Sequence, residues 1–190
     1  MASSGNSSPA SVPNRAKYMQ KDLERNAKWF KLEHVWKGVP SNIFEDFAKI
    51  TRSVNRLLCV VVEDPSLSEA QKWRAVDCAF TIFWEDPTYR RGDLFEIPSQ
   101  GGSIIEKIIS QGNLDPSLAN SIDNKGKDIQ KSNSDKAISF GAYGSPTFLI
   151  ADEQSGQVEM FFGSDRFEQL AYLSGKPWYG PSPPKSLSKF

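Results

Sequence analysis

The sequence predicts an α/β protein in which a long helical block is followed by a short strand–strand–helix unit. Apolar residues recur at spacings of three and four over much of residues 17–140, which is typical of amphipathic helices. Near residue 146 the pattern changes to two short apolar runs separated by turn residues. With 190 residues, 38% of them hydrophobic, the chain is long enough to bury a core without a metal or disulfide.

The first half of the chain predicts coil and then two helices. Residues 1–14 are rich in Ser, Asn, Pro and Gly and indicate coil. We expect a helix over 17–33, broken by Gly38 and Pro40. The clearest helix is expected over 42–63, with Ser41 as its N-cap and Asp64-Pro65 as its end.

Three more helical segments are expected before the pattern changes. Ser68 precedes a helix over about 69–84, and a short helix begins at Ile104 and ends near Gly112. Leu114-Asp115-Pro116 opens a longer polar helix that runs toward Phe140.

The last elements form a hairpin and a helix. Residues 146–150 and 157–162 predict two strands, and the turn residues Asp152–Gly156 between them indicate a β-hairpin. Ser164 is expected to cap a final helix, which Gly175 ends. A two-stranded sheet is marginally stable alone, and the sequence offers no upstream strand to pair with it.

Composition excludes several classes of function. Lys and Arg number 23, as do Asp and Glu, and this neutral balance argues against nucleic acid as a partner. The longest apolar run, Leu57–Val62, is too short to cross a membrane. Cys59 and Cys78 lie in apolar helical patterns, where a free cysteine acts as a small hydrophobic residue, and they indicate a reducing compartment. The single histidine, His34, is expected to have a surface or capping role. We expect no metal site and no catalytic residue among the motifs present.

Two segments are candidate binding sites. Gly144-Ser145-Pro146 stands directly before a strand, and a cis bond between Ser145 and Pro146 would present the Ser145 backbone to an extended peptide. Gly163-Ser164-Asp165-Arg166 stands at a helix start, where free N–H groups attract an anion. An ordinary trans proline and an ordinary capped helix are the alternatives.

Taken together, these segments resemble the second half of a thioredoxin fold, and the chain is similar to the kappa-class glutathione transferases of the DsbA-like family. The resemblance extends over nearly the whole chain. It is carried by Phe140–Thr147, Met160–Arg166, Leu173–Pro181 and the N-terminal segment from Gly5 to Met19.

The resemblance implies an α/β thioredoxin-like (DsbA-type) fold with a large helical insert and glutathione as co-substrate. The boundaries expected are 1–16 for the loop entering the insert, 17–140 for the helical insert, 141–177 for the C-terminal thioredoxin half and 178–190 for a tail.

Glutathione contacts follow from the same resemblance. The cysteinyl unit is expected to pair with the backbone of Ser145 before Pro146, and the γ-glutamyl end to lie at Ser164 and Asp165, flanked by Gly163 and Arg166. Asn6 and Arg15 are expected at the other end of the tripeptide.

Three features depart from the family pattern. Ser145 replaces a hydrophobic residue, and Arg15 stands where the family has lysine, with Lys17 nearby. The family's first strand–helix–strand unit, which carries its catalytic serine, has no counterpart here, so we expect the N-terminal βαβ half to be missing.

Three functions therefore remain open. The chain is part of a transferase that conjugates or reduces small hydrophobic electrophiles or peroxides, or it is a non-catalytic module that binds glutathione or a protein through an open strand edge. A 2-hydroxychromene-2-carboxylate isomerase-like enzyme is the third. We expect no membrane partner and consider a homodimer. Ser188-Lys189-Phe190 resembles a peroxisomal address, so the expected location is intracellular, with peroxisome, mitochondrion or cytoplasm as compartments.

Overall fold

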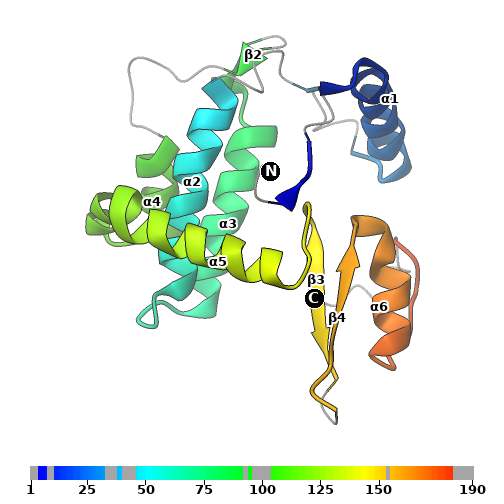
Figure 1. The fold of residues 1–190 in the computed structure, drawn as a ribbon. Coiled ribbons are helices and arrows are strands. Elements are labelled where there is room, and N and C mark those ends of the chain that lie inside the picture. The colour runs from blue at the N-terminus through cyan, green and yellow to red at the C-terminus, as the bar shows by residue number, and fades with distance from the viewer. Residues whose placement is uncertain are drawn as a thin grey trace. The chain divides into compact units, whose positions relative to one another are not determined.

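The computed structural model describes residues 4–7, 11–32, 38–39, 46–91, 94–95, 104–152 and 155–181. The chain forms two compact units, one of residues 31–133 and one of residues 1–30 with 134–190. Figure 1 shows the elements of both, and each unit is described by itself. The helical unit of residues 31–133 covers fewer residues than the insert predicted over 17–140. The boundaries of that insert remain a prediction.

The helical unit is built around helices α2 (Asp46–Glu63), α3 (Glu69–Trp84) and α4 (Ile104–Gly112). Their apolar stripes meet in one core, in which Leu57, Ile82 and Ile108 are at most 1% exposed. Other members of this core are Val54, Val61, Ala75, Cys78, Ala79, Phe83, Tyr89, Ile104, Ile109, Leu114 and Ile122. The stripes that predicted helices therefore do form a core.

Helix α3 begins where the sequence predicts. The hydroxyl of Ser68 accepts a hydrogen bond from the backbone N–H of Gln71 at 3.3 Å, and the Gln71 side chain accepts one from the Ser68 N–H at 3.1 Å. This capping box satisfies two N–H groups that the first helical turn leaves unpaired. Helix α2 ends at Glu63, directly before Asp64-Pro65, as expected. Ser41, its predicted cap, lies outside the described residues.

The long helix expected after Leu114 is interrupted, so that prediction is wrong in detail. The segment is a 3-10 helix, η4 (Pro116–Ser121), then a π-helical turn, η5 (Ile122–Gly126), and only then α5 (Lys127–Ser139). At Gly126 a Cβ would lie 2.7 Å from the Arg56 carbonyl oxygen of α2. The π-helical turn η5 thus lies where the chain packs closely against α2. The spacing of apolar residues does not reveal this contact.

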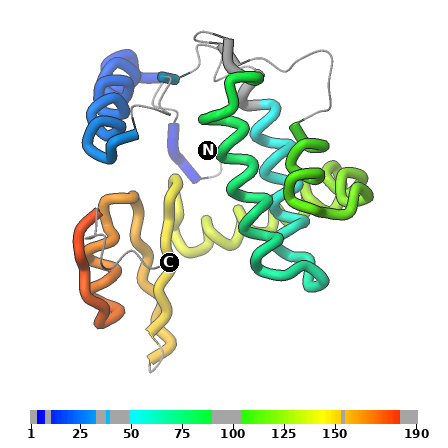
Figure 2. Tube along the Cα trace, turned by 180° about the vertical axis from the view of Figure 1, so that it is seen from behind, coloured from blue at the N-terminus to red at the C-terminus, as the bar shows by residue number. Residues whose placement is uncertain are grey.

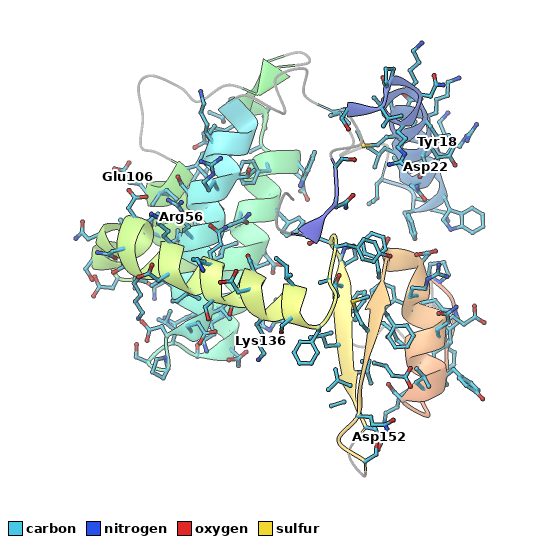
Figure 3. The ribbon with its side chains drawn as sticks, in the orientation of Figure 1. Tyr18, Asp22, Arg56, Glu106, Lys136 and Asp152 are labelled. Atoms are coloured by element: carbon cyan, nitrogen blue, oxygen red, sulfur yellow. The ribbon has the colours of Figure 1, made fainter. Side chains whose placement is uncertain are left out.

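Arg56 ties α2 to this irregular segment. Its guanidinium donates to Asp123 Oδ1 at 3.0 Å and to Gln130 Oε1 at 3.4 Å, and Figure 3 labels it. The unit also contains η3 (Pro87–Tyr89) and the antiparallel strands β1 (Arg90–Arg91) and β2 (Leu94–Phe95), which the sequence analysis missed. Strands of two residues are too short to show an alternating pattern.

The first helix, α1, spans Pro13–Trp29, so the helix predicted over 17–33 begins four residues too late. Residues 13–16 are helical because proline at the first helical position needs no N–H partner and has a helical φ. The helix ends before Lys31, whose φ of 58° is left-handed. Gly38 and Pro40 therefore lie beyond its end. Tyr18 and Asp22, labelled in Figure 3, lie one turn apart on α1.

Strands β3 (Thr147–Ala151) and β4 (Val158–Phe162) form the predicted antiparallel hairpin. Leu149 pairs with Met160, and Phe148 with Phe161. The Phe148 ring lies edge-on to Phe167 at 5.2 Å, so this face of the hairpin meets helix α6 (Phe167–Leu173). Figure 2 shows α6 beside β4.

Gly175 ends α6 as predicted. Its φ is +60°, and its N–H donates to Tyr172 O at 3.1 Å while the Lys176 N–H donates to Ala171 O at 2.8 Å. These two bonds form a Schellman motif. The chain then returns along α6, and Trp178 stacks on Phe167 with ring centroids 6.4 Å apart.

Candidate functional site

The start of β3 meets the end of β4 at the two segments that the sequence singled out. The Ser145–Pro146 bond is cis, and the Gly163 N–H donates to the Pro146 carbonyl at 3.0 Å. Thr147 stabilises the same loop, because its hydroxyl donates a hydrogen bond to Gly144 O at 2.7 Å. The two candidate segments therefore lie side by side, with Ser145 exposed beside Gly163 and the helix start that follows it.

The acidic and basic groups of the site come from the 3-10 helix η6 (Ser164–Arg166). Arg166 Nη2 lies 3.6 Å from Asp165 Oδ2, and both side chains stay largely in solvent, 44% and 71% exposed. A negative and a positive group thus stand together, close to the Ser145 backbone. Such a pair suits a small ligand that carries both an ammonium and a carboxylate.

Ser164 does not cap a helix, which corrects one prediction. Gly163 occupies the N-cap position of η6 and Arg166 that of α6, and neither helix start receives a side-chain cap. The intervening 3-10 turn moves the N-cap of the α-helix two residues along the chain, from Ser164 to Arg166. The exposed Ser164 hydroxyl is therefore not engaged as a helix cap.

Asn6 reaches the same loop from the N-terminal segment. Its Nδ2 donates to the Tyr143 carbonyl at 2.6 Å, across 137 positions of sequence. Its Oδ1 accepts from the Ser7 N–H at 2.8 Å. The structure thus brings Asn6, Ser145, Pro146 and the segment from Gly163 to Arg166 into one neighbourhood.

Arg15 is placed differently. It lies exposed in the first turn of α1, and its backbone N–H donates to Val12 O at 2.9 Å. Among the described residues, no contact joins its side chain to the loop before Pro146.

Two aromatic rings and a glycine that the sequence analysis left unassigned shape the loop. Tyr143 and Phe162 have ring centroids 4.5 Å apart, at 41°. A Cβ at Gly144 would lie 2.7 Å from Phe162 Cε2, so only glycine lets the backbone pass this ring. A glycine directly before Ser145-Pro146 was a signal for such a close approach.

Other candidate chemistry is sparse in the part of the chain that the structure describes. No group of three His, Cys, Asp or Glu side chains suits a metal ion there. Burial raises the pKa of the Cys59 thiol, with Glu63 adding to the effect, and burial also raises the pKa of Cys78. Both cysteines are free, and Cys78 donates to Gln111 Oε1 at 2.9 Å. His34 and the C-terminal Ser188-Lys189-Phe190 lie outside the described residues.

Comparison with known proteins agrees with this arrangement. The family model for the DSBA-like thioredoxin domain matches residues 1–174. Glutathione S-transferase kappa 1 of Homo sapiens is 30% identical over 190 residues, covering 97% of this chain and 76% of the human protein. This chain belongs to the DsbA-like thioredoxin family, in its kappa glutathione transferase class. The Rattus norvegicus kappa 1 protein is 28% identical over 97% of the chain and 76% of its own length. The Caenorhabditis elegans kappa 1 protein is 29% identical over 93% of this chain and 73% of its own length.

Family membership confirms the predicted fold class, a thioredoxin-like fold with a helical insert. In the thioredoxin part, β3, β4 and α6 are the elements described. Among the described residues, no helix is both long and apolar enough to cross a bilayer.

Proposed function

We propose that this chain binds glutathione at the loop before Pro146 and acts as a kappa-type glutathione transferase on small hydrophobic electrophiles or peroxides. One observation carries the proposal. The 3.0 Å hydrogen bond from Gly163 to Pro146 joins the strand start to the charged turn η6. One small peptide can therefore contact the Ser145 backbone with one part and the charged turn η6 with another.

The cysteinyl unit pairs with Ser145. Ser145 is exposed and immediately precedes β3, so its backbone N–H and C=O are accessible to a short extended peptide. A backbone contact is independent of the Ser145 side chain. The departure from a hydrophobic residue at this position therefore leaves the pairing intact.

The γ-glutamyl end lies at η6. Its ammonium pairs with Asp165 and its carboxylate with Arg166, while the exposed Ser164 hydroxyl offers a further hydrogen bond. Gly163 precedes this turn, and its lack of a Cβ leaves room for the Asp165 carboxylate beside the backbone.

The glycyl end is assigned to Asn6 and Arg15. The Nδ2 amide of Asn6 donates one N–H to Tyr143 O, and its second N–H can donate to a carboxylate. Arg15 lies exposed on the first turn of α1 and pairs with the same group when the ligand is bound. The arginine guanidinium can bind a carboxylate through two N–H groups at once, whereas the lysine ammonium acts as a single point charge.

These contacts hold and orient glutathione, and none of them has a role in ionising the glutathione thiol. An unassisted thiol with a pKa of about 8.5 is only a few per cent thiolate at neutral pH. Binding and turnover are therefore measured separately.

Calorimetric titration of the full chain with glutathione tests the binding site. Asp165→Asn removes the partner of the ammonium, so we expect the dissociation constant to rise at least about tenfold, or about 1.4 kcal/mol. Asp77→Asn makes the same change on the exposed surface of α3 and is expected to leave the affinity unchanged. Equal affinity for the two variants would refute the assignment of Asp165.

Glutathione-dependent turnover of an activated aryl halide and of an organic hydroperoxide tests the activity. Turnover above the uncatalysed rate, reduced in Asp165→Asn, supports the transferase. Tight binding with no turnover assigns the chain to the non-catalytic class instead.

Partner and compartment are part of the proposal. A homodimer is proposed, and peroxisomal or mitochondrial delivery follows from the resemblance of Ser188-Lys189-Phe190 to a peroxisomal address and from the class itself. A fluorescent reporter that carries these last residues and stays diffuse in the cytosol would count against peroxisomal delivery.

A further inference from the structure

The Ser145 hydroxyl stands in the loop that the proposed function assigns to the cysteinyl unit of glutathione. Ser145 is exposed, and no described residue forms a hydrogen bond with its backbone or with its side chain. Pro146 follows it, and the residue before a proline is held in extended conformations. The backbone of Ser145 is therefore suited to pairing with an extended peptide, and its hydroxyl is available to that peptide.

The backbone pairing decides where the two side chains lie. In an antiparallel pair, residues directly opposite each other project their side chains to the same face, with Cβ atoms about 5 Å apart. The cysteinyl Sγ and the Ser145 Oγ are each one covalent bond from these Cβ atoms. A serine hydroxyl rotates freely about its Cβ–Oγ bond, so it can donate a hydrogen bond to the sulfur opposite.

The charged groups around this position give a thiolate little net stabilisation. Asp165 and Arg166 of η6 carry opposite charges 3.6 Å apart, so their effects on the sulfur oppose each other. Glu168, exposed in the first turn of α6, disfavours an anion, and Arg15 of α1 is assigned to the glycyl carboxylate. The neighbouring ends of β3 and β4 are uncharged. A neutral hydrogen-bond donor is therefore the group that can favour the thiolate over the thiol.

We infer, on the basis of the proposed glutathione site, that Ser145 Oγ donates a hydrogen bond to the cysteinyl sulfur of bound glutathione and stabilises its thiolate. Ser145 is then a catalytic residue, since its hydroxyl touches the reacting atom. A hydrogen bond to an ionised acceptor is about twice as strong as one between neutral groups, so this contact favours the charged sulfur. The hydrophobic residue that is typical of this position in the family makes no such bond.

The reaction that this contact assists is balanced without any further reactant. The glutathione thiol gives its proton to water and becomes a thiolate. With an activated aryl halide, a sulfur lone pair forms the new S–C bond, and the halide leaves with the electron pair of the broken carbon–halogen bond. Ser145 keeps its proton throughout, because it only donates a hydrogen bond.

The thiol pKa of bound glutathione tests the contact directly. Ultraviolet absorbance of the thiolate is followed across pH on the full wild-type chain saturated with glutathione. We expect a pKa at least about one unit below the value of about 8.5 for a free thiol, since hydrogen bonds to charged groups contribute about that much. This measurement needs no variant, so it is independent of any effect of substitution on folding.

Ser145→Thr and Ser145→Val form a matched pair of variants. Both introduce side chains branched at Cβ and of similar shape, but only threonine keeps a hydroxyl. We expect Ser145→Thr to retain the lowered thiol pKa and Ser145→Val to return it to about 8.5. Ser174→Ala removes an exposed serine hydroxyl at the end of α6 and is the control that leaves the thiol pKa unchanged.

The pH dependence of kcat with an activated aryl halide gives a second readout, because kcat reports groups in the bound complex. At about pH 6.5, below the thiol pKa in either case, kcat of Ser145→Val should be about tenfold lower than that of Ser145→Thr. The two values should converge above about pH 9, where glutathione is mostly thiolate in both variants. A loss of packing would lower kcat at every pH.

Calorimetric titration at about pH 6, where the free thiol is protonated, separates this inference from the proposed function. Ser145→Val is expected to bind glutathione there as the wild type does, because the backbone pairing is kept. Absence of glutathione binding by the wild type overturns both proposals. Binding with an unshifted thiol pKa, or equal pKa values in the threonine and valine variants, overturns the role of the Ser145 hydroxyl and leaves the binding site standing.

Discussion

At Gly163 the backbone turns out of β4 with a φ of +106° and a ψ of 145°, a conformation open almost only to glycine. The Asp165 carboxylate also occupies the space in which a Cβ would lie. The same residue donates the hydrogen bond to Pro146 O. A single position thus controls the junction of the two binding segments.

Gly163→Ala is expected to lower the free energy of unfolding by about 2–3 kcal/mol, because a Cβ strains this backbone conformation, whereas the exposed Asp165 carboxylate can rotate away. The control is Gly156→Ala in the hairpin turn, where φ is +69° but a Cβ meets no atom within 4 Å. We expect it to cost about 1 kcal/mol. Urea unfolding followed by circular dichroism measures both, and an equal loss would mean that the backbone of Gly163 is no more strained by a Cβ than that of Gly156.

At the scale of elements, an ion pair joins the end of α3 to α4. Lys107 of α4 donates to the Asp86 carboxylate, whose side chain is 14% exposed, and its Nζ lies 5.1 Å from the centre of the Tyr89 ring. Burial raises the pKa of Asp86, but hydrogen bonds from Lys107 and Thr88 outweigh it, so the pKa falls below 3.8. The hydrogen bond to Asp86 raises the pKa of Lys107 above 10.5.

The pair predicts how stability depends on pH. Because the folded pKa of Asp86 is depressed, its contribution is present above about pH 4 and is lost as the pH falls through the folded pKa. The contribution of Lys107 is lost only as the pH rises through its raised folded pKa. Asp86→Asn is therefore expected to cost about 1–3 kcal/mol at pH 7.

Urea unfolding at several pH values measures this cost. The difference between wild type and Asp86→Asn should shrink as the pH falls through the depressed folded pKa of Asp86. Glu85→Gln, at the exposed neighbouring position, is the control and should change little at any pH. A difference that persists undiminished in acid would show that Asp86 acts through packing rather than charge.

At the scale of the whole molecule, burial is unevenly divided between the two units. The described hydrophobic residues that are buried lie mostly in the helical unit, where Leu57 and Ile108 are fully buried. In the other unit, the described buried residues are Ala27, Ala142 and Leu170. Strands β3 and β4 contain none.

Native-state hydrogen exchange is expected to reflect this division. Amides of α2 and α3 should be protected at least about tenfold more than those of β3 and β4 in dilute protein, about 1.4 kcal/mol. Protection of the hairpin equal to that of α2 in dilute protein would contradict this prediction.

Much of the fold and part of the site were predictable from local chemistry. Helix α3 was predicted at Ser68 because a capping box is encoded within four residues, and α6 ends at Gly175 because glycine alone suits its left-handed turn. The hairpin followed from two short apolar runs and the turn residues between them. The start of α1 at Pro13 was not predicted, because proline breaks a helix in its interior but begins one at its first turn.

The sequence by itself determined α3, α4 and the β3–β4 hairpin, the family resemblance and the candidate residues Ser145, Pro146 and Gly163–Arg166, because these depend on neighbours within a few positions. Only the tertiary structure decided that Asn6 meets the carbonyl of Tyr143 and that Gly126 packs on the Arg56 carbonyl. Both contacts join residues distant in sequence, and no local pattern encodes such a contact.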